Sequence, residues 1–348
     1  MTPLLFSVFV ISFSSSYARK IQRNYRLFLF LSALVFILIS TFRPHSGWGA
    51  DTSAYVSAYN EVLSNPKLST EVTFKLIANF VNKIGNNVTF LFFIYAFLSV
   101  LIKENTIKKN AIFPLLSWIV YLSCWFIVHD MYQIRVGASI AFFMLALPYL
   151  QEGNLKKYML CALLATLFHT QALVLFPLFF LGHKNINGRT VLVYDFILIV
   201  SYLFYFLQID ILFLVVQLLV KIKIPRAEQL QYYYKLSQSG IVDLGKINAF
   251  SPIVLVRLFI TLLLLHSYKN LNDKPLFPVL VRISMISFAV RMFFYAIPVI
   301  GMRIYEYFSV TEIFLFPMLL YVIKEKKTIH FLLFVYCIFF ILLRLRTA

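Results

Sequence analysis

Long apolar blocks set the limits on how this chain of 348 residues can fold. Most blocks contain about 15–25 residues, the length that a helix needs to cross a hydrocarbon core roughly 30 Å thick. Lipid offers no partner to backbone N–H and C=O groups, and the blocks lack two-residue alternation, so helices are predicted rather than a barrel. The sequence therefore predicts an all-α, polytopic integral membrane protein with about 10–11 transmembrane helices, in one membrane-embedded domain over 1–348. The blocks lie at 3–17, 27–42, 88–102, 111–128, 136–150, 158–181, 190–222, 249–267, 276–298, 302–322 and 328–343.

The composition excludes an ordinary water-soluble domain. Hydrophobic residues make up 61% of the chain and charged residues 13%, whereas soluble domains carry about 25% charged residues. The net charge is +18, because 32 Lys and Arg residues face only 14 Asp and Glu residues. In a membrane protein this excess is explained first by basic loops at anionic headgroups, so membrane lipid is the expected partner and no nucleic acid is expected.

Clusters of Lys and Arg between the blocks predict the orientation, because cytoplasmic loops carry an excess of these residues. With the clusters in the cytoplasm, the N-terminus and the segments 43–87, 129–135, 223–248 and 299–303 lie outside, and 43–87 and 223–248 are the large outer loops. The clusters contain Arg19, Lys20, Arg23, Arg26, Lys103, Lys108, Lys109, Lys156, Lys157, Lys269, Lys274, Lys324, Lys326 and Lys327.

Two blocks leave the span count open. The block 158–181 is interrupted by a polar tripeptide that begins at His169, and 190–222 is too long for one simple span. Either the first block crosses once and the second twice, or the first is a helical hairpin and the second crosses once. We favour the single crossing of 158–181, although Lys184 and Arg189 would then face outward against the charge bias.

No motif indicates a cofactor, a metal or a removed leader. The sequence contains no Gly-rich phosphate loop, HExxH or nucleophile elbow. The three cysteines, Cys124, Cys161 and Cys337, lie inside apolar blocks without ligand spacing, so we expect buried thiols and neither disulfide nor metal. The block 3–17 lacks a preceding basic segment and a following cleavage site, so it is expected to be a retained span.

A polar stretch, RPHSGWGADTSAY, follows the second block and covers residues 43–55. Asp51 could be a general base, an acceptor for sugar hydroxyls or the N-cap of a helix. On that helix Tyr55, Tyr59 and Val62 form one stripe, which is typical of a membrane-interface belt but also suits stacking on sugars. The next segment, STEVTFKLIANFVNKIG, predicts an interfacial helix on the outer surface.

Arginines on the outer side need an explanation, because an intramembrane Arg costs on the order of 2.5 kcal/mol or more without a polar partner. If they converge, they form an anion pocket whose planar guanidinium groups suit a diphosphate. The alternative is that they snorkel to headgroups or pair with Asp51, Asp130, Glu306 or Glu312. The five arginines are Arg43, Arg135, Arg257, Arg291 and Arg303.

His169 is a second candidate for proton transfer. It lies in LFHTQALVLF, where a polar tripeptide inside an apolar helix is costly unless it lines a cavity. A histidine that titrates near neutrality suits proton transfer. A structural histidine bonded to a neighbouring helix is the alternative.

At these residues the chain resembles the EpsG family of Wzy-type polysaccharide polymerases. The family pattern has four motifs in order: an Arg then Gly-x-Asp-Thr-x-x-Tyr, an Ile-Arg before small residues, Phe-His-x-Ser-Ala-Leu, and an Arg before Tyr-Phe. Val136, where the family often has Gln, and Gln171, where it usually has Ser, depart from the pattern and are expected to tune the substrate. The matching residues are Arg43, Gly49, Asp51, Thr52, Tyr55, Ile134, Arg135, Gly137, Ala138, Phe168, His169, Ala172, Leu173, Arg303, Tyr307 and Phe308.

The resemblance implies a GT-C-like membrane glycosyltransferase that joins oligosaccharide repeat units linked to undecaprenyl diphosphate, for O-antigen, capsule or exopolysaccharide. Its site would face the exterior of the bacterial inner membrane, without metal, and a chain-length regulator is a further partner to consider. His169 and Asp51 would be catalytic, with His169 favoured as the base, while the five arginines, Tyr55 and Tyr307 would bind diphosphate and sugar. The rivals are a flippase of lipid-linked oligosaccharide and a cell-envelope ligase or acyltransferase, although the blocks show no repeated halves of the kind many transporters have.

Overall fold

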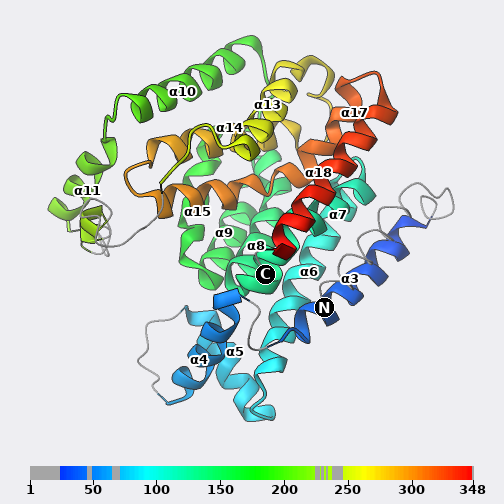
Figure 1. Cartoon of the computed structure of the whole chain (residues 1–348), viewed down its shortest axis with the longest axis vertical. Coiled ribbons are helices and arrows are strands. Elements are labelled where there is room, and N and C mark those ends of the chain that lie inside the picture. The colour runs from blue at the N-terminus through cyan, green and yellow to red at the C-terminus, as the bar shows by residue number, and fades with distance from the viewer. Residues whose placement is uncertain are drawn as a thin grey trace. The chain divides into compact units, whose positions relative to one another are not determined.

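The computed structural model describes residues 24–44, 49–64, 71–223, 228, 231–232, 234–236 and 246–346. Within these residues every regular element is a helix, so the prediction of an all-α membrane protein is confirmed (Figure 1). The chain divides into two compact units. Unit 1 comprises 1–183, 273–279 and 312–348, and unit 2 comprises 184–272 and 280–311. The expectation of a single domain stays a prediction.

Five helices of the described residues are long and apolar enough to cross a membrane. They are α6 (Val88–Asn110), the continuous helix formed by α7 and η1 (Pro114–Tyr132), α8 (Ile134–Gln151), α10 (Gly188–Phe206) and α18 (Lys326–Arg346). Shorter apolar helices are α3 (Tyr25–Thr41), η2 (Thr170–Leu181) and α13 (Pro252–His266). The predicted block 3–17 lies outside the described residues.

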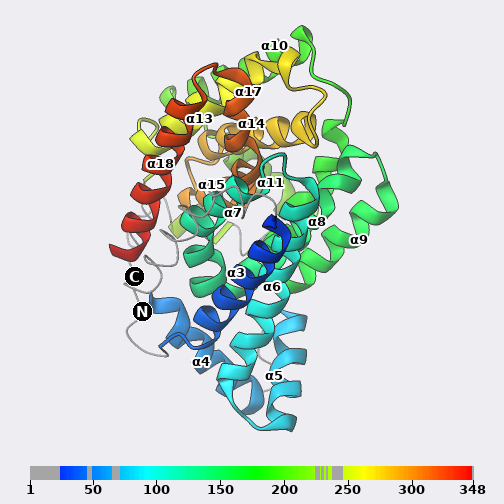
Figure 2. The same cartoon turned by 90° about the vertical axis from the view of Figure 1, so that its right-hand side faces the viewer.

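Unit 1 is built around α6 and α8, which pack against each other. α3 packs along α6, α9 along α8, and α18 along η1, while α4 and α5 gather at one end of α6 (Figure 2). The remaining elements of unit 1 are α4 (Gly49–Ser64), α5 (Val72–Ile84), α9 (Leu155–Phe168), α16 (Glu312–Leu315), η4 (Phe316–Met318) and α17 (Leu319–Val322). Unit 2 holds α10, α11 (Ile211–Lys221), α13, η3 (Tyr268–Asn270), most of α14 (Phe277–Phe293) and α15 (Pro298–Ser309).

The block 158–181 folds as a helical hairpin with its turn at His169. α9 ends at Phe168, His169 has extended backbone angles, and η2 then runs back as a 3₁₀-helix. The Tyr158 hydroxyl, near the start of α9, donates to the Leu175 carbonyl at 2.6 Å. With about 1.5 Å per residue in α9 and about 2.0 Å in η2, each arm is roughly 20–25 Å long. The expected single crossing is therefore wrong.

The two ends of this hairpin lie together. The Gln151 side-chain amide donates to the His183 carbonyl at 3.0 Å. Gly153, whose φ is +68°, lies against the His183 ring. Because Lys156 and Lys157 begin one arm and Lys184 directly follows the other, the hairpin keeps these charges at one end and obeys the charge bias.

The long block 190–222 is two helices rather than one. α10 ends at Phe206 and α11 begins at Ile211. Gln208, in the break, has φ of +54°, and the Asp210 carboxylate accepts from the Phe213 N–H at 3.0 Å, which caps α11.

A buried ion pair lies between α6 and η1. Lys103 Nζ is 2.7 Å from Asp130 Oδ2, and the two side chains are 1% and 0% exposed. The placement of Lys103 in a cytoplasmic loop is thus wrong, because α6 continues to Asn110. Asp130 belongs to η1 (Leu122–Tyr132), a π-helix, rather than to a short outer turn. A Cβ at Gly137 would lie 2.1 Å from the His129 carbonyl oxygen, so only glycine permits α8 to approach η1 this closely.

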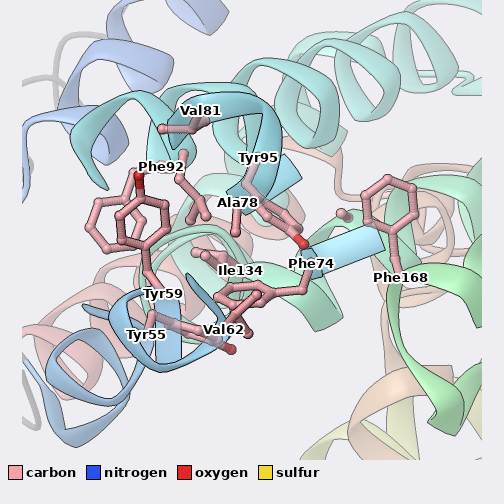
Figure 3. Packing of buried hydrophobic residues seen from close by; sticks show 12 residues of the cluster. Tyr55, Tyr59, Val62, Phe74, Ala78, Val81, Phe92, Tyr95, Ile134 and Phe168 are labelled. Carbon is pink, nitrogen blue, oxygen red and sulfur yellow. The ribbon is translucent and has the colours of Figure 1, made fainter. Parts of the chain in front are cut away.

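The stripe of Tyr55, Tyr59 and Val62 on α4 is buried, not exposed to a membrane interface (Figure 3). These side chains are 7%, 2% and 2% exposed and pack with residues of α5 and α6, as Figure 3 shows. Burying an aromatic side chain in this way stabilises the fold by about 1.5–3 kcal/mol. The interpretation of the tyrosines as an interface belt is therefore wrong.

α5 has two apolar faces. Phe74, Ala78 and Val81 pack into the core that α4 and α6 share, whereas Val72, Leu76, Phe80 and Ile84 are exposed. An exposed apolar stripe beside Lys75 and Lys83 is typical of a helix that lies on a membrane surface.

Candidate functional site

A glutamate that the motifs do not contain joins two candidate residues. Glu71 immediately precedes α5, Arg135 lies in the first turn of α8, and His169 forms the tip of the hairpin. Glu71 Oε1 is 2.9 Å from His169 Nδ1, while Glu71 Oε2 pairs with Arg135 Nη1. The three residues, called the Glu71 cluster below, link elements that are 64 and 98 residues apart in sequence.

Local contacts fix the position of the hairpin tip relative to α5. The Thr73 hydroxyl donates at 2.8 Å to the carbonyl of Leu167, two residues before His169. The Tyr95 ring of α6 packs edge-on against Phe168, with ring centroids 5.9 Å apart. These contacts hold His169 beside Glu71, and they follow from the polar break that ends α9.

The Glu71 carboxylate is ionised over the whole neutral range. Burial raises the pKa of Glu71, but the hydrogen bond with His169 and the charge of Arg135 outweigh burial and bring the pKa down to about 2. The side chains of Glu71, His169 and Arg135 are 11%, 17% and 28% exposed, respectively. The cluster is thus partly accessible, with the acid permanently charged.

Arg135 and Arg43 rest on the same aromatic cluster, the one drawn in Figure 3. The Arg135 guanidinium carbon lies 5.2 Å from the Tyr55 ring centroid, and that of Arg43 lies 4.2 Å from the Phe92 ring centroid. Burial raises the pKa of Tyr55, so its hydroxyl stays neutral. Two of the predicted cations therefore share one wall, which also holds the predicted Tyr55.

Arg43 is 2% exposed and donates from Nη1 to the Met131 carbonyl. Its Nε and Nη2 atoms have no hydrogen-bond partner among the residues that the structure describes. Arg43 thus joins the end of α3 to η1 and keeps two buried donors for a further acceptor.

Asp51 stands one helical turn before Tyr55, the ring on which Arg135 rests. α4 begins at Gly49, so Asp51 occupies the first turn of the helix rather than the N-cap, and its side chain is exposed. A carboxylate in the first turn stabilises a helix through the macrodipole. The structure therefore gives Asp51 a helix-stabilising position, and its role in chemistry stays a prediction.

The other predicted residues belong to unit 2. Arg291 of α14 donates to the Asn248 carbonyl at 3.2 Å and lies 5.4 Å from the Tyr305 ring centroid. Arg257 of α13 is 3% exposed, whereas Arg303 of α15 is exposed. Tyr307, one turn after Arg303, is 1% exposed and packs inside the unit. The convergence of all five arginines stays a prediction.

Cys124, Cys161 and Cys337 are all buried, as expected. Among the described residues, His, Cys, Asp and Glu side chains form no group of three that could hold a metal ion.

Glu71 is the site residue that motif reasoning missed. The sequence does carry a signal for it: a carboxylate is rare here, and this one stands directly before an amphipathic helix in the large outer loop. Its partners, however, come from α8 and the hairpin tip, which no local pattern connects to it.

Comparison with known sequences gives one match that covers nearly the whole chain. The sequence profile of the EpsG family matches residues 26–348. No curated protein and no solved structure matches this chain.

Proposed function

Because this chain belongs to the EpsG family, which points to polysaccharide polymerases of the glycosyltransferase type, we propose that it joins oligosaccharide repeat units carried on undecaprenyl diphosphate. The donor is the growing chain on its lipid diphosphate, and the acceptor is a sugar hydroxyl of a new repeat unit. The observation that carries this proposal is the Glu71 carboxylate between His169 and Arg135, which combines an oriented imidazole with a cation.

His169 is the general base of the proposed reaction. An ionised Glu71 accepts the proton on Nδ1, which leaves the lone pair of a neutral imidazole on Nε2. Nε2 takes the proton of the acceptor hydroxyl while its oxygen bonds to the anomeric carbon. The bond from that carbon to the diphosphate breaks, and the electron pair leaves with the diphosphate. The imidazolium then returns its proton to the released diphosphate or to water.

Arg135 stabilises the negative charge that develops on the leaving diphosphate. It is 28% exposed and remains charged, and the aromatic wall beneath it fixes its plane. Arg43 adds a second positive charge to this wall. Together, Glu71, Arg135 and Arg43 carry one net positive charge, which favours an anion. For Arg257, Arg291 and Arg303 of unit 2 we likewise propose a role in binding diphosphate.

Asp51 is assigned to the sugars, and Tyr55 and Tyr307 are assigned to supporting the arginines. The exposed Asp51 carboxylate accepts hydrogen bonds from sugar hydroxyls, and it is the alternative base if His169 is not required. Tyr55 supports Arg135 from below, and Tyr307 supports the helix that carries Arg303. The proposed membrane is the bacterial inner membrane, with the Glu71 cluster at its outer face, because the hairpin tip lies opposite the end that carries Lys156 and Lys157. A chain-length regulator is the proposed protein partner.

Purified protein in nanodiscs, supplied with lipid-linked repeat units, tests the reaction directly. We expect a ladder of polymers that stay on the carrier lipid, each longer by one repeat unit. A deletion strain gives a second readout, in which single repeat units stand on the surface anchor. Repeat units stranded inside the cell would instead identify a flippase, and polymer retained on the carrier lipid would identify a ligase; either result refutes the proposal.

A further inference from the structure

A basic cavity lies at the end of unit 1 that is remote from Arg43. Its volume is about 570 Å³, within the range of small-ligand pockets. Helix α3 extends 17 residues from the cavity toward Arg43, which is about 26 Å, close to the thickness of a hydrocarbon core. The cavity therefore belongs to the other membrane surface. It is lined by Tyr25, Arg26, Lys108, Lys109, Ala111, Ile112 and Pro114.

Of the three cations of this cavity, Lys108 pairs with an acid, whereas Arg26 and Lys109 pair with none among the described residues. Lys108 Nζ binds Glu104 at 3.0 Å. Arg26 donates to the Tyr25 hydroxyl at 3.4 Å, and Lys109 is exposed. Among the residues that the structure describes, no carboxylate lies within ion-pair distance of Arg26 or Lys109. Three cations and one carboxylate leave the cavity with an excess of two positive charges, so it favours an anion.

Helix dipoles account for two of these cations but not for the third. Lys108 and Lys109 occupy the last turn of α6, where positive charge is favourable. Arg26 occupies the first turn of α3, where positive charge is unfavourable. An anion bound between the two helix ends removes this conflict, because it meets both Arg26 and the free N–H groups of α3.

An exposed apolar stripe on α3 begins directly beside Arg26. It consists of Leu27, Leu31, Val35, Leu38 and Phe42, which are 59%, 52%, 40%, 52% and 69% exposed. The spacing of these residues places them along one side of the helix, the geometry of a surface that acyl chains cover. We propose that the cavity binds the phosphate of an anionic phospholipid, whose acyl chains lie along this stripe. The proposal does not depend on the proposed function.

The test measures lipid retention by the full-length protein. Wild type and variants are purified in a mild detergent with equal amounts of phosphatidylglycerol and phosphatidylcholine, and bound lipid is counted by native mass spectrometry. Wild type should retain phosphatidylglycerol, and the double variant Arg26→Gln/Lys109→Gln should bind it roughly tenfold or more weakly, because each basic residue near anionic lipid contributes severalfold. The matched control Lys326→Gln/Lys327→Gln removes two exposed charges at the start of α18 and should bind as wild type does.

Two results would overturn the proposal. An equal loss of phosphatidylglycerol in the control would mean that total charge, not the cavity, attracts the lipid. Displacement of the lipid by inorganic phosphate at equal concentration would mean that the cavity takes a soluble anion rather than a lipid headgroup. The single variant Lys109→Gln guards against misfolding, since this side chain is exposed, and it should also bind phosphatidylglycerol several times more weakly.

Discussion

Two clusters of unit 1 pair a carboxylate with a cation, yet their surroundings differ. The Lys103–Asp130 pair lies between α6 and η1 with side chains 1% and 0% exposed. In the Glu71–Arg135 pair the acid is 11% and the cation 28% exposed. Asp130 also accepts hydrogen bonds from Tyr121, at 2.8 Å, and from Ser99, so its oxygens are saturated by the fold itself.

The difference separates a group that holds the fold together from one that can react. A buried charge pair whose hydrogen-bonding atoms all have protein partners has no access to a substrate. Removing one partner leaves an uncompensated charge in an apolar interior. Glu71, in contrast, divides its oxygens between a cation and a partly exposed imidazole, which can both meet a substrate. Both pairs join a carboxylate to a cation. Their different exposure, and the hydrogen-bonding capacity that each leaves for a substrate, therefore separate the structural pair from the candidate catalytic one.

The largest effect is expected when the buried pair is broken. Asp130→Asn leaves Lys103 buried without its counter-ion, which costs about 3–5 kcal/mol. We expect most of the protein to be lost as aggregate, measured as the monodisperse fraction and the thermal unfolding midpoint in detergent. Asp273→Asn, at a side chain that is 71% exposed and pairs with Lys274, should leave both unchanged. Recovery in the double variant Lys103→Met/Asp130→Asn would confirm the cause, whereas a single variant as stable as wild type would contradict it.

His169→Ala is expected to lower activity strongly and stability little, the opposite of Asp130→Asn. Removing the base should lower polymerisation roughly 10²–10⁴-fold, while the unfolding midpoint falls much less than in Asp130→Asn, because only the hydrogen bond with Glu71 is lost. The control is His330→Ala, at a half-buried histidine whose ring bonds to the Lys326 carbonyl of its own helix, α18. The rate is measured with purified lipid-linked repeat units. If His169→Ala and Asp51→Asn both still make long polymer at normal protein level, neither residue is the base.

Glu71→Gln tests whether the acid positions His169. A neutral amide can donate to Nδ1, which would place the imidazole proton on Nε2 and remove the lone pair that the reaction needs. We expect a fall in the maximal rate of about 10²-fold with little change in the half-saturating concentration of repeat units. Glu71→Asp, which keeps the charge, should recover part of the rate. A change confined to the half-saturating concentration would instead make Glu71 a substrate-binding residue.

These clusters also show what the sequence can and cannot predict. The predicted apolar block 27–42 corresponds to α3 within two residues at each end, because the length and composition of an apolar block are enough to predict such a helix. The end of α6 is not predicted correctly: the block 88–102 stops before Lys103 and Glu104, because two charged residues indicate a loop unless a buried partner for Lys103 is known. That partner, Asp130, lies 27 residues away in a π-helix that no periodicity indicates.

The same limit applies to the candidate site. Short motifs predict Arg135, His169 and Tyr55 as site residues. In the structure Arg135 and His169 share Glu71, and Arg135 lies over the Tyr55 ring. Glu71 was not found, because its two partners lie 64 and 98 residues away. From the sequence we favour a single crossing of 158–181 over the hairpin turn at His169, although the charge bias of Lys184 favours the hairpin. Local patterns predict elements, whereas pairings between distant elements need the packed structure.

The low pKa of Glu71 predicts that the contribution of this residue to stability depends on pH. The folded pKa is about 2, below the ordinary value of 4.5, so the stabilisation is fully present above pH 4.5 and is lost as the pH falls toward 2. The shift corresponds to an upper bound of about 3.4 kcal/mol, which solvent screening at this partly exposed site reduces. The difference in unfolding midpoint between wild type and Glu71→Gln should therefore shrink between pH 4.5 and pH 2. A difference that is constant over this range would mean that Glu71 gains nothing from its partners.

The smallest effects should come from the tyrosine that accompanies each cluster. Tyr121→Phe removes a donor to the buried, charged Asp130 and should cost about 1.5–3 kcal/mol, because no water can replace it. Tyr55→Phe keeps the ring that lies beneath Arg135 and should cost at most about 1 kcal/mol. Thermal unfolding of the two variants, side by side, measures this contrast. If Tyr55→Phe were the more destabilising change, the Glu71 cluster would be part of the structural core, and its partial exposure would no longer argue for chemistry.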